Sequence, residues 1–202
     1  NAVEEGDANM MGAPYDRIGL RECLKVARNH EHYKSAVATG AGRGMAMGYW
    51  INAGLQSSAT LNVSSDGHVA VLTGSPDIGG SRASMALMAA EVLGIPFEHI
   101  HPQVAATDSV GHTDVTGGSR TTVATGQAVI QAAEQCVAEM CRRAAAEWGV
   151  EIGLVAWSQG AAHYGDQTLT FRELASRAGT MGGPLTFSSS LNSTNAAPSF
   201  GV

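Results

Sequence analysis

Apolar residues recur at intervals of three and four from Val123 to Trp148, and polar residues fill the positions between them. This spacing predicts one long amphipathic helix, because residues three and four apart share a helix face. The loop in front of it, Thr116–Thr122, contains hydroxyl side chains, two glycines and an arginine. Such a loop can cap a helix and can hold an anion at the positive end of the helix dipole. We therefore expect the chain to be organised around the stretch Asp108–Trp148.

Alternation of apolar and polar residues predicts a hairpin over Ala59–Gly74, with its turn at the sequence SDG of residues 65–67. An alanine- and methionine-rich segment follows and predicts a helix that ends at Gly94. The run Phe97–Ala106 then predicts a strand. Pro102 favours the edge of a sheet for this strand, because proline has no N–H to donate to a neighbour.

The remaining segments have weaker patterns. From them we expect, in chain order, an irregular arm at residues 1–16, a helix at Arg17–Tyr33, strands bent at Gly48 and Gly54, two short strands at Leu154–Tyr164 and Gln167–Leu169, a helix capped by Thr170 and ended by Gly179, and a loop from Met181 to Val202.

Together these elements predict an α/β fold, an α+β mixed sheet with packed helices, in which the long amphipathic helix follows a Gly-Gly-Ser-Arg loop. An N-terminal arm and helix would occupy residues 1–40, and the main domain residues 41–202.

The composition narrows the possible functions of the 202 residues, of which 44% are hydrophobic and 15% charged. A net charge of −6 with scattered Lys and Arg excludes an electrostatic footprint for nucleic acid. No apolar run is long enough for a membrane span. Three cysteines without a paired metal spacing are interpreted as reduced thiols, which favours a cytoplasmic location. The chain starts without Met and stops within an apolar run, so we expect it to be a piece of a longer protein.

The tetrapeptide Gly-Gly-Ser-Arg occurs twice, at Gly79–Arg82 and at Gly117–Arg120, each time just before a predicted helix. Each copy offers unhindered N–H groups, a hydroxyl and a guanidinium, which suit phosphate oxygens or the ring atoms of a pterin. Taken singly, each copy is more simply a capped helix start. The repetition adds weight to a ligand site formed by two neighbouring helix starts.

Both copies belong to longer motifs. The run Asp77–Ser81, DIGGS, leads to Ala90–Ile95, AEVLGI, and the run Thr116–Thr122, TGGSRTT, leads to Gly126–Val129, GQAV. In these motifs the chain resembles the molybdopterin-binding part of the large subunit of the xanthine oxidase and aldehyde oxidase family, the molybdenum hydroxylases. The resemblance covers nearly the whole chain and makes residues 41–202 a partial molybdopterin-binding domain. The chain departs from the family's pattern at Gly80, where the family has a glutamine.

The resemblance implies a set of cofactor-binding residues in the two loops: Gly79, Gly80, Ser81, Thr116, Gly117, Gly118, Ser119, Arg120 and Thr121. Arg120 would stabilise anionic oxygens of the cofactor, and Ser119 and Thr121 would orient it. The implied cofactor is molybdopterin, the molybdenum cofactor, with the cytosine dinucleotide form as one option. The implied reaction is hydroxylation of an aldehyde or an N-heterocycle. No catalytic residue and no protein ligand to a metal are expected in this chain, because the family's catalytic glutamate lies in a later segment.

The resemblance also implies partners, namely the remaining part of the large subunit, iron–sulfur and FAD domains or subunits, and a small-molecule substrate. Three cysteines cannot supply two iron–sulfur clusters, so we expect no turnover by the chain alone. Two alternatives stay open: a phosphate- or nucleotide-binding module without redox chemistry, and a structural fragment without a ligand. His99 and His101 point the same way on a strand, but without a third ligand we interpret them as solvated histidines.

Overall fold

The computed structural model describes residues 2–10, 12–193 and 198–202. The chain divides into two compact units, one made of Asn1–Ala53 with Asn195–Val202 and the other of Gly54–Thr194. The second, larger unit contains both Gly-Gly-Ser-Arg loops. The proposed domain limits at residues 1–40 and 41–202 stay a prediction.

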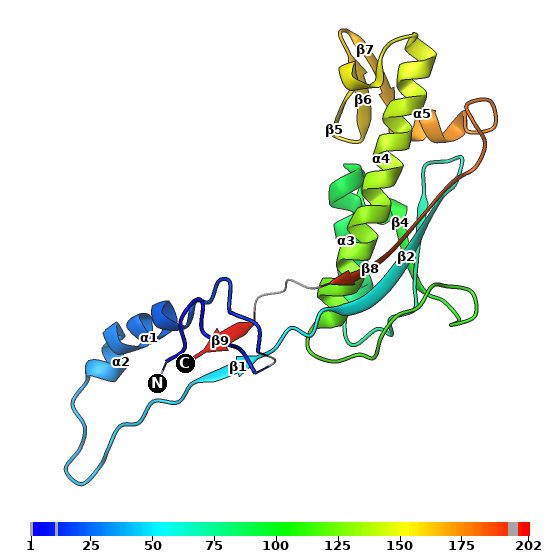
Figure 1. Ribbon diagram of the computed structural model, residues 1–202. Coiled ribbons are helices and arrows are strands. Elements are labelled where there is room, and N and C mark those ends of the chain that lie inside the picture. The colour runs from blue at the N-terminus through cyan, green and yellow to red at the C-terminus, as the bar shows by residue number, and fades with distance from the viewer. Residues whose placement is uncertain (1, 11, 194–197) are drawn as a thin grey trace. The chain divides into compact units, whose positions relative to one another are not determined.

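The larger unit is built on a four-stranded sheet in the order β4-β3-β2-β8 (Figure 1). Strands β2 (Leu55–Val63) and β3 (Val69–Thr73) form the expected antiparallel hairpin. Strand β4 (Ile100–Val104) lies parallel to β3, and β8 (Leu185–Ser193) lies antiparallel to β2. The sheet is therefore mixed, and the predicted fold class is confirmed.

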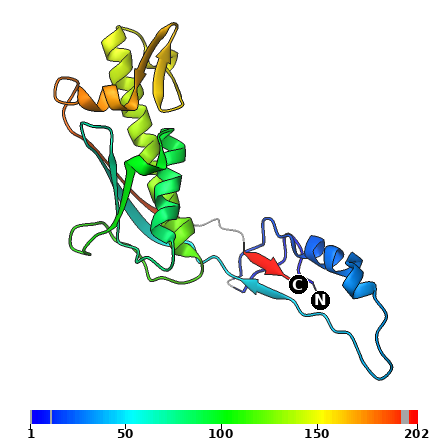
Figure 2. The same cartoon turned by 180° about the vertical axis from the view of Figure 1, so that it is seen from behind.

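Two helices pack on one face of this sheet (Figures 1 and 2). Helix α3 (Ser81–Leu93) contacts β4 and β3, and the long helix α4 (Gly126–Trp148) contacts β2 and β8. Helix α3 ends at Gly94 in the left-handed conformation, as expected. The core between the two layers consists mainly of alanine, leucine, valine and methionine side chains, which are fully or almost fully buried. The many alanines among these side chains let the helices approach one another closely.

The close approach of α3 and α4 depends on Gly126, the first residue of α4. A Cβ atom at this position would lie 2.5 Å from Sδ of Met88 on α3. A π-helical turn at Thr121–Thr125 precedes Gly126 and connects α4 to the polar loop. The predicted start of the long helix near Val123 thus falls inside this π-helical turn.

The two edges of the sheet differ. Pro102 lies in the edge strand β4, as expected, although Phe97–His99 forms a 3-10 turn and the strand begins only at Ile100. At the other edge, the prediction of a loop from Met181 to Val202 was wrong, because β8 occupies nine of these residues. Its inward positions alternate with exposed Thr, Ser and Asn side chains. The serine-rich composition hid an alternating pattern that becomes a strand only when β8 pairs with β2.

A second, three-stranded sheet follows α4 and has the order β5-β6-β7. It contains β5 (Ala156–Ser158), β6 (Ala161–Tyr164) and β7 (Gln167–Thr170). The single strand predicted over Leu154–Tyr164 was wrong, because the chain turns at Gln159 and Gly160, which both have positive φ. A 3-10 turn at Ile152–Leu154 precedes β5.

Helix α5 (Phe171–Ser176) begins with the expected cap. Thr170 accepts a hydrogen bond from the backbone N–H of Glu173, and the Glu173 side chain accepts one from the backbone N–H of Thr170, which is a complete capping box. The helix ends at Ser176, before the predicted stop at Gly179, and the chain continues through turns to β8.

The smaller unit contains two helices and a two-stranded sheet. Helix α1 (Leu20–Asn29) and helix α2 (Glu31–Lys34) replace the single helix predicted over Arg17–Tyr33, because His30 between them has an extended backbone. Strand β1 (Gly48–Trp50) pairs with β9 (Ser199–Gly201), a second strand within the segment predicted to be a loop.

Candidate functional site

The two Gly-Gly-Ser-Arg loops lie at the same end of the four-stranded sheet, where β3 and β4 finish. Strands β3 and β4 are parallel, and each is followed by one copy of the tetrapeptide and then by a helix. Because parallel strands have their carboxyl ends on the same side of a sheet, the loops before α3 and α4 lie together at the carboxyl end of β3 and β4 (Figure 1). Ligands bind at the carboxyl ends of the strands in many α/β sheets.

Three buried hydroxyl groups connect the two loops. Oγ1 of Thr125, in the π-helical turn, lies 2.8 Å from Oγ of Ser75, which precedes the first loop. It also lies 2.8 Å from Oγ of Ser57 on β2. Sequence analysis did not single out these three residues. The sequence gives no sign of this contact, because the three residues are far apart along the chain and lie in three separate segments.

The first loop already contains an anion of the chain's own. Oδ1 of Asp77 accepts hydrogen bonds from the backbone N–H of Gly79 and Ser81, at 3.1 and 3.0 Å, and from the Ser81 hydroxyl at 3.1 Å. Oδ2 accepts from Nε of Arg82 at 2.8 Å. The hydrogen bond from Arg82, followed by those from the backbone, holds the pKa of Asp77 well below its usual range. The N-terminus of α3 is therefore capped by Asp77.

Glycine is needed in this loop for its backbone. Gly79 and Gly80 have φ values of 108° and 86°, and a Cβ atom at either position would meet no atom within 4 Å. Both residues are exposed. Gly80, where the resemblance leads us to expect a glutamine, is thus a left-handed glycine with open space around it.

The second loop has a different backbone. Its left-handed residues are Gly118 and Ser119, with φ values of 57° and 58°. A left-handed serine is strained by about 1 kcal/mol or more. Thr116, Gly117 and Ser119 are exposed, and a Cβ at Gly117 would meet no atom within 4 Å. The loop therefore presents open backbone and the Ser119 hydroxyl to its surroundings.

The structure gives the guanidinium of Arg120 a role that the sequence did not indicate. Arg120 is fully buried, and its Nη1 and Nη2 donate to the carbonyl oxygens of Asp114 and Gln56 at 2.6 and 2.7 Å. Nη1 also lies 3.4 Å from the carbonyl oxygen of Val115. Burial lowers the pKa of Arg120, and the charge of Asp114 opposes this effect. Through Nη1 and Nη2 the guanidinium holds the loop to β2.

Asp114 strengthens the same connection. Its Oδ2 accepts from the backbone N–H of Gln56 at 2.7 Å, and its own backbone N–H donates to the Gln56 carbonyl at 3.1 Å. His112 lies 3.2 Å from the other carboxylate oxygen. The hydrogen bond from Gln56, then the one from His112, lowers the pKa of Asp114. Asp114 therefore joins the second loop to the backbone of β2, and His112 contacts its carboxylate.

The second loop fits a polar ligand. Oγ1 of Thr121 and Nε of Arg120 are buried and have no hydrogen-bond partner among the described residues. Unsatisfied buried donors are costly, and exposed Gly117 and Ser119 lie beside them in sequence. Apart from Nε of Arg120, the donors present are neutral backbone and hydroxyl groups, since Nη1 and Nη2 of Arg120 donate to carbonyl oxygens. The first loop offers less, because Asp77 accepts from Ser81 and Arg82.

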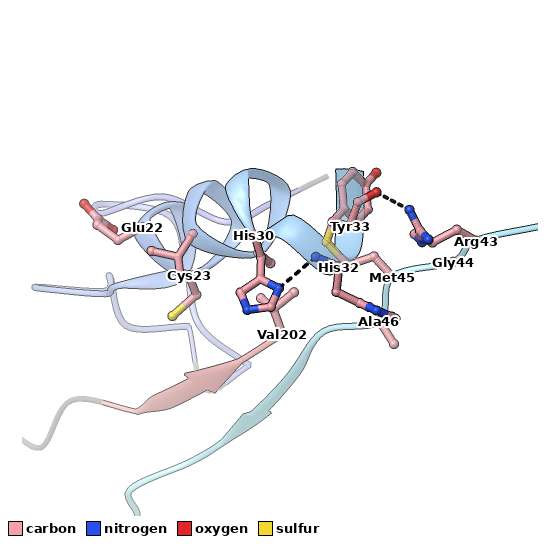
Figure 3. Close-up of a pocket in the computed structure, with 12 residues that line it drawn as sticks. Glu22, Cys23, His30, His32, Tyr33, Arg43, Gly44, Met45, Ala46 and Val202 are labelled. Atoms are coloured by element: carbon pink, nitrogen blue, oxygen red, sulfur yellow. Dashed lines mark hydrogen bonds between the residues drawn. The ribbon is translucent and has the colours of Figure 1, made fainter. Parts of the chain in front are cut away.

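Other candidate groups involve different residues. The structure brings His68 against His99 and His101, with ring centroids 4.8 and 5.2 Å apart. Even so, the described part of the chain holds no group of three His, Cys, Asp or Glu side chains that could bind a metal ion. The smaller unit has an apolar groove of about 690 Å³ between α1 and the segment that includes Met45 (Figure 3). This groove shares no residue with the two loops.

Comparison with known proteins identifies the family. Residues 20–201 match the model of the molybdopterin cofactor-binding domain, so the chain belongs to that family. It is 36% identical over 135 residues to a xanthine dehydrogenase of Drosophila pseudoobscura pseudoobscura, covering 60% of this chain and 10% of that protein. It is 32% identical over 154 residues to a xanthine dehydrogenase of Calliphora vicina, covering 67% of this chain and 11% of that protein. The predicted family and cofactor class are confirmed, and the alternative of a nucleotide-binding module without redox chemistry has no support.

Solved structures share the fold. A Cu,Mo-CO dehydrogenase superposes with a TM-score of 0.78 at 21% identity, over 95% of this chain and 29% of that one. Quinoline 2-oxidoreductase from Pseudomonas putida 86 gives 0.75 at 17% identity, over 96% of this chain and 29% of that one. The chain thus spans less than a third of these solved chains and about a tenth of the xanthine dehydrogenases. Within the described residues, no helix is long and apolar enough to cross a membrane.

Proposed function

We propose that this chain is part of the large subunit of a molybdenum hydroxylase and binds part of the molybdopterin cofactor through its two Gly-Gly-Ser-Arg loops. The observation that carries the proposal is the position of both loops at the carboxyl ends of the parallel strands β3 and β4. A helix that starts at the carboxyl end of a strand offers a ligand its free backbone N–H groups, and its dipole favours an anion there. Family membership supports the identity of the ligand.

The second loop is proposed as the main contact. Open backbone at the exposed Gly117 lets the cofactor approach, while the buried Gly118 gives the loop its left-handed turn. The hydroxyls of Thr116, Ser119 and Thr121 donate to the polar atoms of the cofactor.

Arg120 is proposed as a positioning residue, because its guanidinium fixes the carbonyl oxygens of Asp114 and Gln56. In the first loop, Gly79 and Gly80 leave open space for the cofactor, and Ser81 helps to hold Asp77 in place.

When bound, the cofactor supplies the two-electron chemistry of a hydroxylation. We propose an aldehyde or an N-heterocycle as the substrate and the cytosine dinucleotide as one form of the cofactor. The remaining part of the large subunit would supply the catalytic glutamate, and iron–sulfur and FAD domains or subunits would accept the electrons. The free thiols Cys23, Cys136 and Cys141 support a reducing, cytoplasmic location.

The cofactor proposal is tested in the chain extended to the full large subunit and purified with its partners from a molybdenum-replete host. After denaturation, molybdenum is measured by elemental analysis and the pterin by fluorescence. Gly117→Val should lower the molybdenum content and the pterin content by roughly tenfold or more, because the valine side chain would occupy the space through which the cofactor reaches the backbone. The fold tolerates this change, because Gly117 has no positive φ and no atom within 4 Å of a Cβ.

Gly153→Val is the matched control, since Gly153 is also exposed and also has no atom within 4 Å of a Cβ, but lies in the 3-10 turn after α4. It should leave both contents unchanged. Folded wild-type protein without molybdenum and pterin would refute the proposal. Equal contents in the two variants would remove Gly117 from the site.

A further inference from the structure

A buried arginine on α4 has a donor group without a partner in the described part of the chain. The side chain of Arg143 is 3% exposed, and its Nε donates to Oε1 of Glu139 at 2.7 Å. Its Nη1 is buried without a hydrogen-bond partner among the described residues. An unsatisfied donor on a buried charged group is costly, so such a group usually has a partner. The cofactor loops do not account for this one.

A second guanidinium lies beside the first. Arg142 donates from Nε and Nη2 to the two carboxylate oxygens of Glu139, at 2.6 and 2.8 Å. These bonds, chiefly those with Arg142, lower the pKa of Glu139 to about 2. One carboxylate therefore serves both arginines, and each keeps further N–H groups for another acceptor.

A glycine lies beside the two guanidinium groups and places no side chain over them. Gly182, in the segment between α5 and β8, has a φ of 112°, and a Cβ there would lie 3.5 Å from Nη2 of both Arg142 and Arg143. A cavity of about 320 Å³ lies at this point. Its lining residues are Arg142, Arg143, Ala146, Glu147, Thr180, Met181 and Gly182.

The charge around the cavity is positive. Glu147, which lines it, is paired with Arg177 at 3.2 Å. Three arginines thus face two glutamates, Glu139 and Glu147, in a chain whose net charge is −6. Two converging guanidinium groups with one shared carboxylate favour an additional anion.

We propose that this cavity binds a small oxyanion, a phosphate group, through the guanidinium groups of Arg142 and Arg143. Arginine suits this ligand because its planar fork can donate two parallel hydrogen bonds to phosphate oxygens. The site is separate from the cofactor loops: Arg142 lies sixteen residues after Gly126 on α4, about 24 Å along the helix at the usual rise per residue. It does not depend on the proposed cofactor function.

The test is calorimetric titration of the chain with inorganic phosphate at constant ionic strength, with chloride as the balancing anion. Wild-type protein should bind phosphate saturably at one site. Arg142→Gln should weaken binding by about tenfold or more, the loss of one charge-assisted contact. Arg142 is half-exposed, so this variant should fold. Arg172→Gln, which removes an exposed arginine on α5, is the matched control and should bind like wild type.

Two further measurements complete the test. Cytidine monophosphate is titrated in the same way, and tighter binding than that of inorganic phosphate would assign the phosphate group to a larger molecule. Arg143→Lys keeps the charge but loses the fork, so it should also bind more weakly. If wild-type protein binds no phosphate saturably, or if Arg142→Gln and Arg172→Gln weaken binding equally, the proposal is overturned.

Discussion

The same four residues, Gly-Gly-Ser-Arg, form two different structures in this molecule. In the first loop the left-handed residues are Gly79 and Gly80, the two glycines. In the second loop they are Gly118 and Ser119, one position further along the tetrapeptide. The two serines therefore differ: one begins a helix under an aspartate cap, and the other is a strained, exposed residue. The tetrapeptide alone does not determine its conformation.

The two arginines differ even more. The side chain of Arg82 is 55% exposed and pairs with Asp77 of its own loop. Arg120 is fully buried and donates to carbonyl oxygens that include Gln56 on β2, a residue distant in sequence. The surroundings of each loop explain the different positions of the two arginines. Arg82 has an aspartate five residues before it, whereas Arg120 lies within hydrogen-bond distance of a strand. A guanidinium in a proposed ligand-binding motif can therefore hold its own loop in place.

The largest expected effect separates the two arginines. Arg120→Met should lower the free energy of unfolding by about 3 kcal/mol, because it removes the charge-assisted hydrogen bonds from a fully buried guanidinium to the carbonyl oxygens of Asp114 and Gln56. Arg82→Met should change it little, since exposed ion pairs contribute little to stability. Urea unfolding, with the midpoint and slope of both variants, measures this difference. A shift of the same size in both variants would show that Arg120 does not hold the loop.

A smaller effect should separate the left-handed residues. Ser119→Gly relieves about 1 kcal/mol of backbone strain, reduced by the greater freedom of glycine in the unfolded chain, so stability should rise slightly. Gly80→Ala introduces similar strain and should lower stability by about 1 kcal/mol. Thermal and urea unfolding of the two variants check the opposite signs. In the extended protein, Ser119→Gly should also lower the pterin content, because it removes a proposed donor.

The pH dependence should show the aspartate cap of the first loop. The folded chain lowers the pKa of Asp77 from its ordinary 3.8. Its carboxylate therefore stabilises the fold above that value and loses this contribution as the pH falls further below it. Wild-type protein should lose more stability than Asp77→Asn when the pH falls from about 5 to about 3. Urea midpoints at both pH values measure the difference, and parallel losses would contradict the cap.

The smallest expected effect concerns the ion pair itself. Arg82→Gln should raise the pKa of Asp77 toward its ordinary value, because the hydrogen bond from Arg82 is the largest cause of the lowering. The backbone N–H groups of Gly79 and Ser81 should keep it below that value. Carboxyl carbon shifts in an NMR titration report this pKa. An unchanged value would assign the lowering to the backbone alone.

Sequence patterns were reliable where local interactions decide the structure. The hairpin of β2 and β3, the stop of α3 at Gly94 and the cap of α5 at Thr170 were all predicted, since each depends on residues close in sequence. Strand β8 was missed because its serines and asparagines resemble a loop until β2 supplies the partner. Strand β9 was missed for the same reason, since β1 lies far away in sequence.

Motif spacing and helix periodicity were enough to predict the family, the two loops and the helix that follows each of them, because both depend on residues close together in the chain. The contacts of each loop became known only from the packing of distant segments. This packing placed Arg120 under β2, put Asp77 at the start of α3 and joined the loops through the Ser57, Thr125 and Ser75 hydroxyls. The physical reason is that burial and long-range hydrogen bonds set the role of a polar side chain, and both arise only when distant segments pack together.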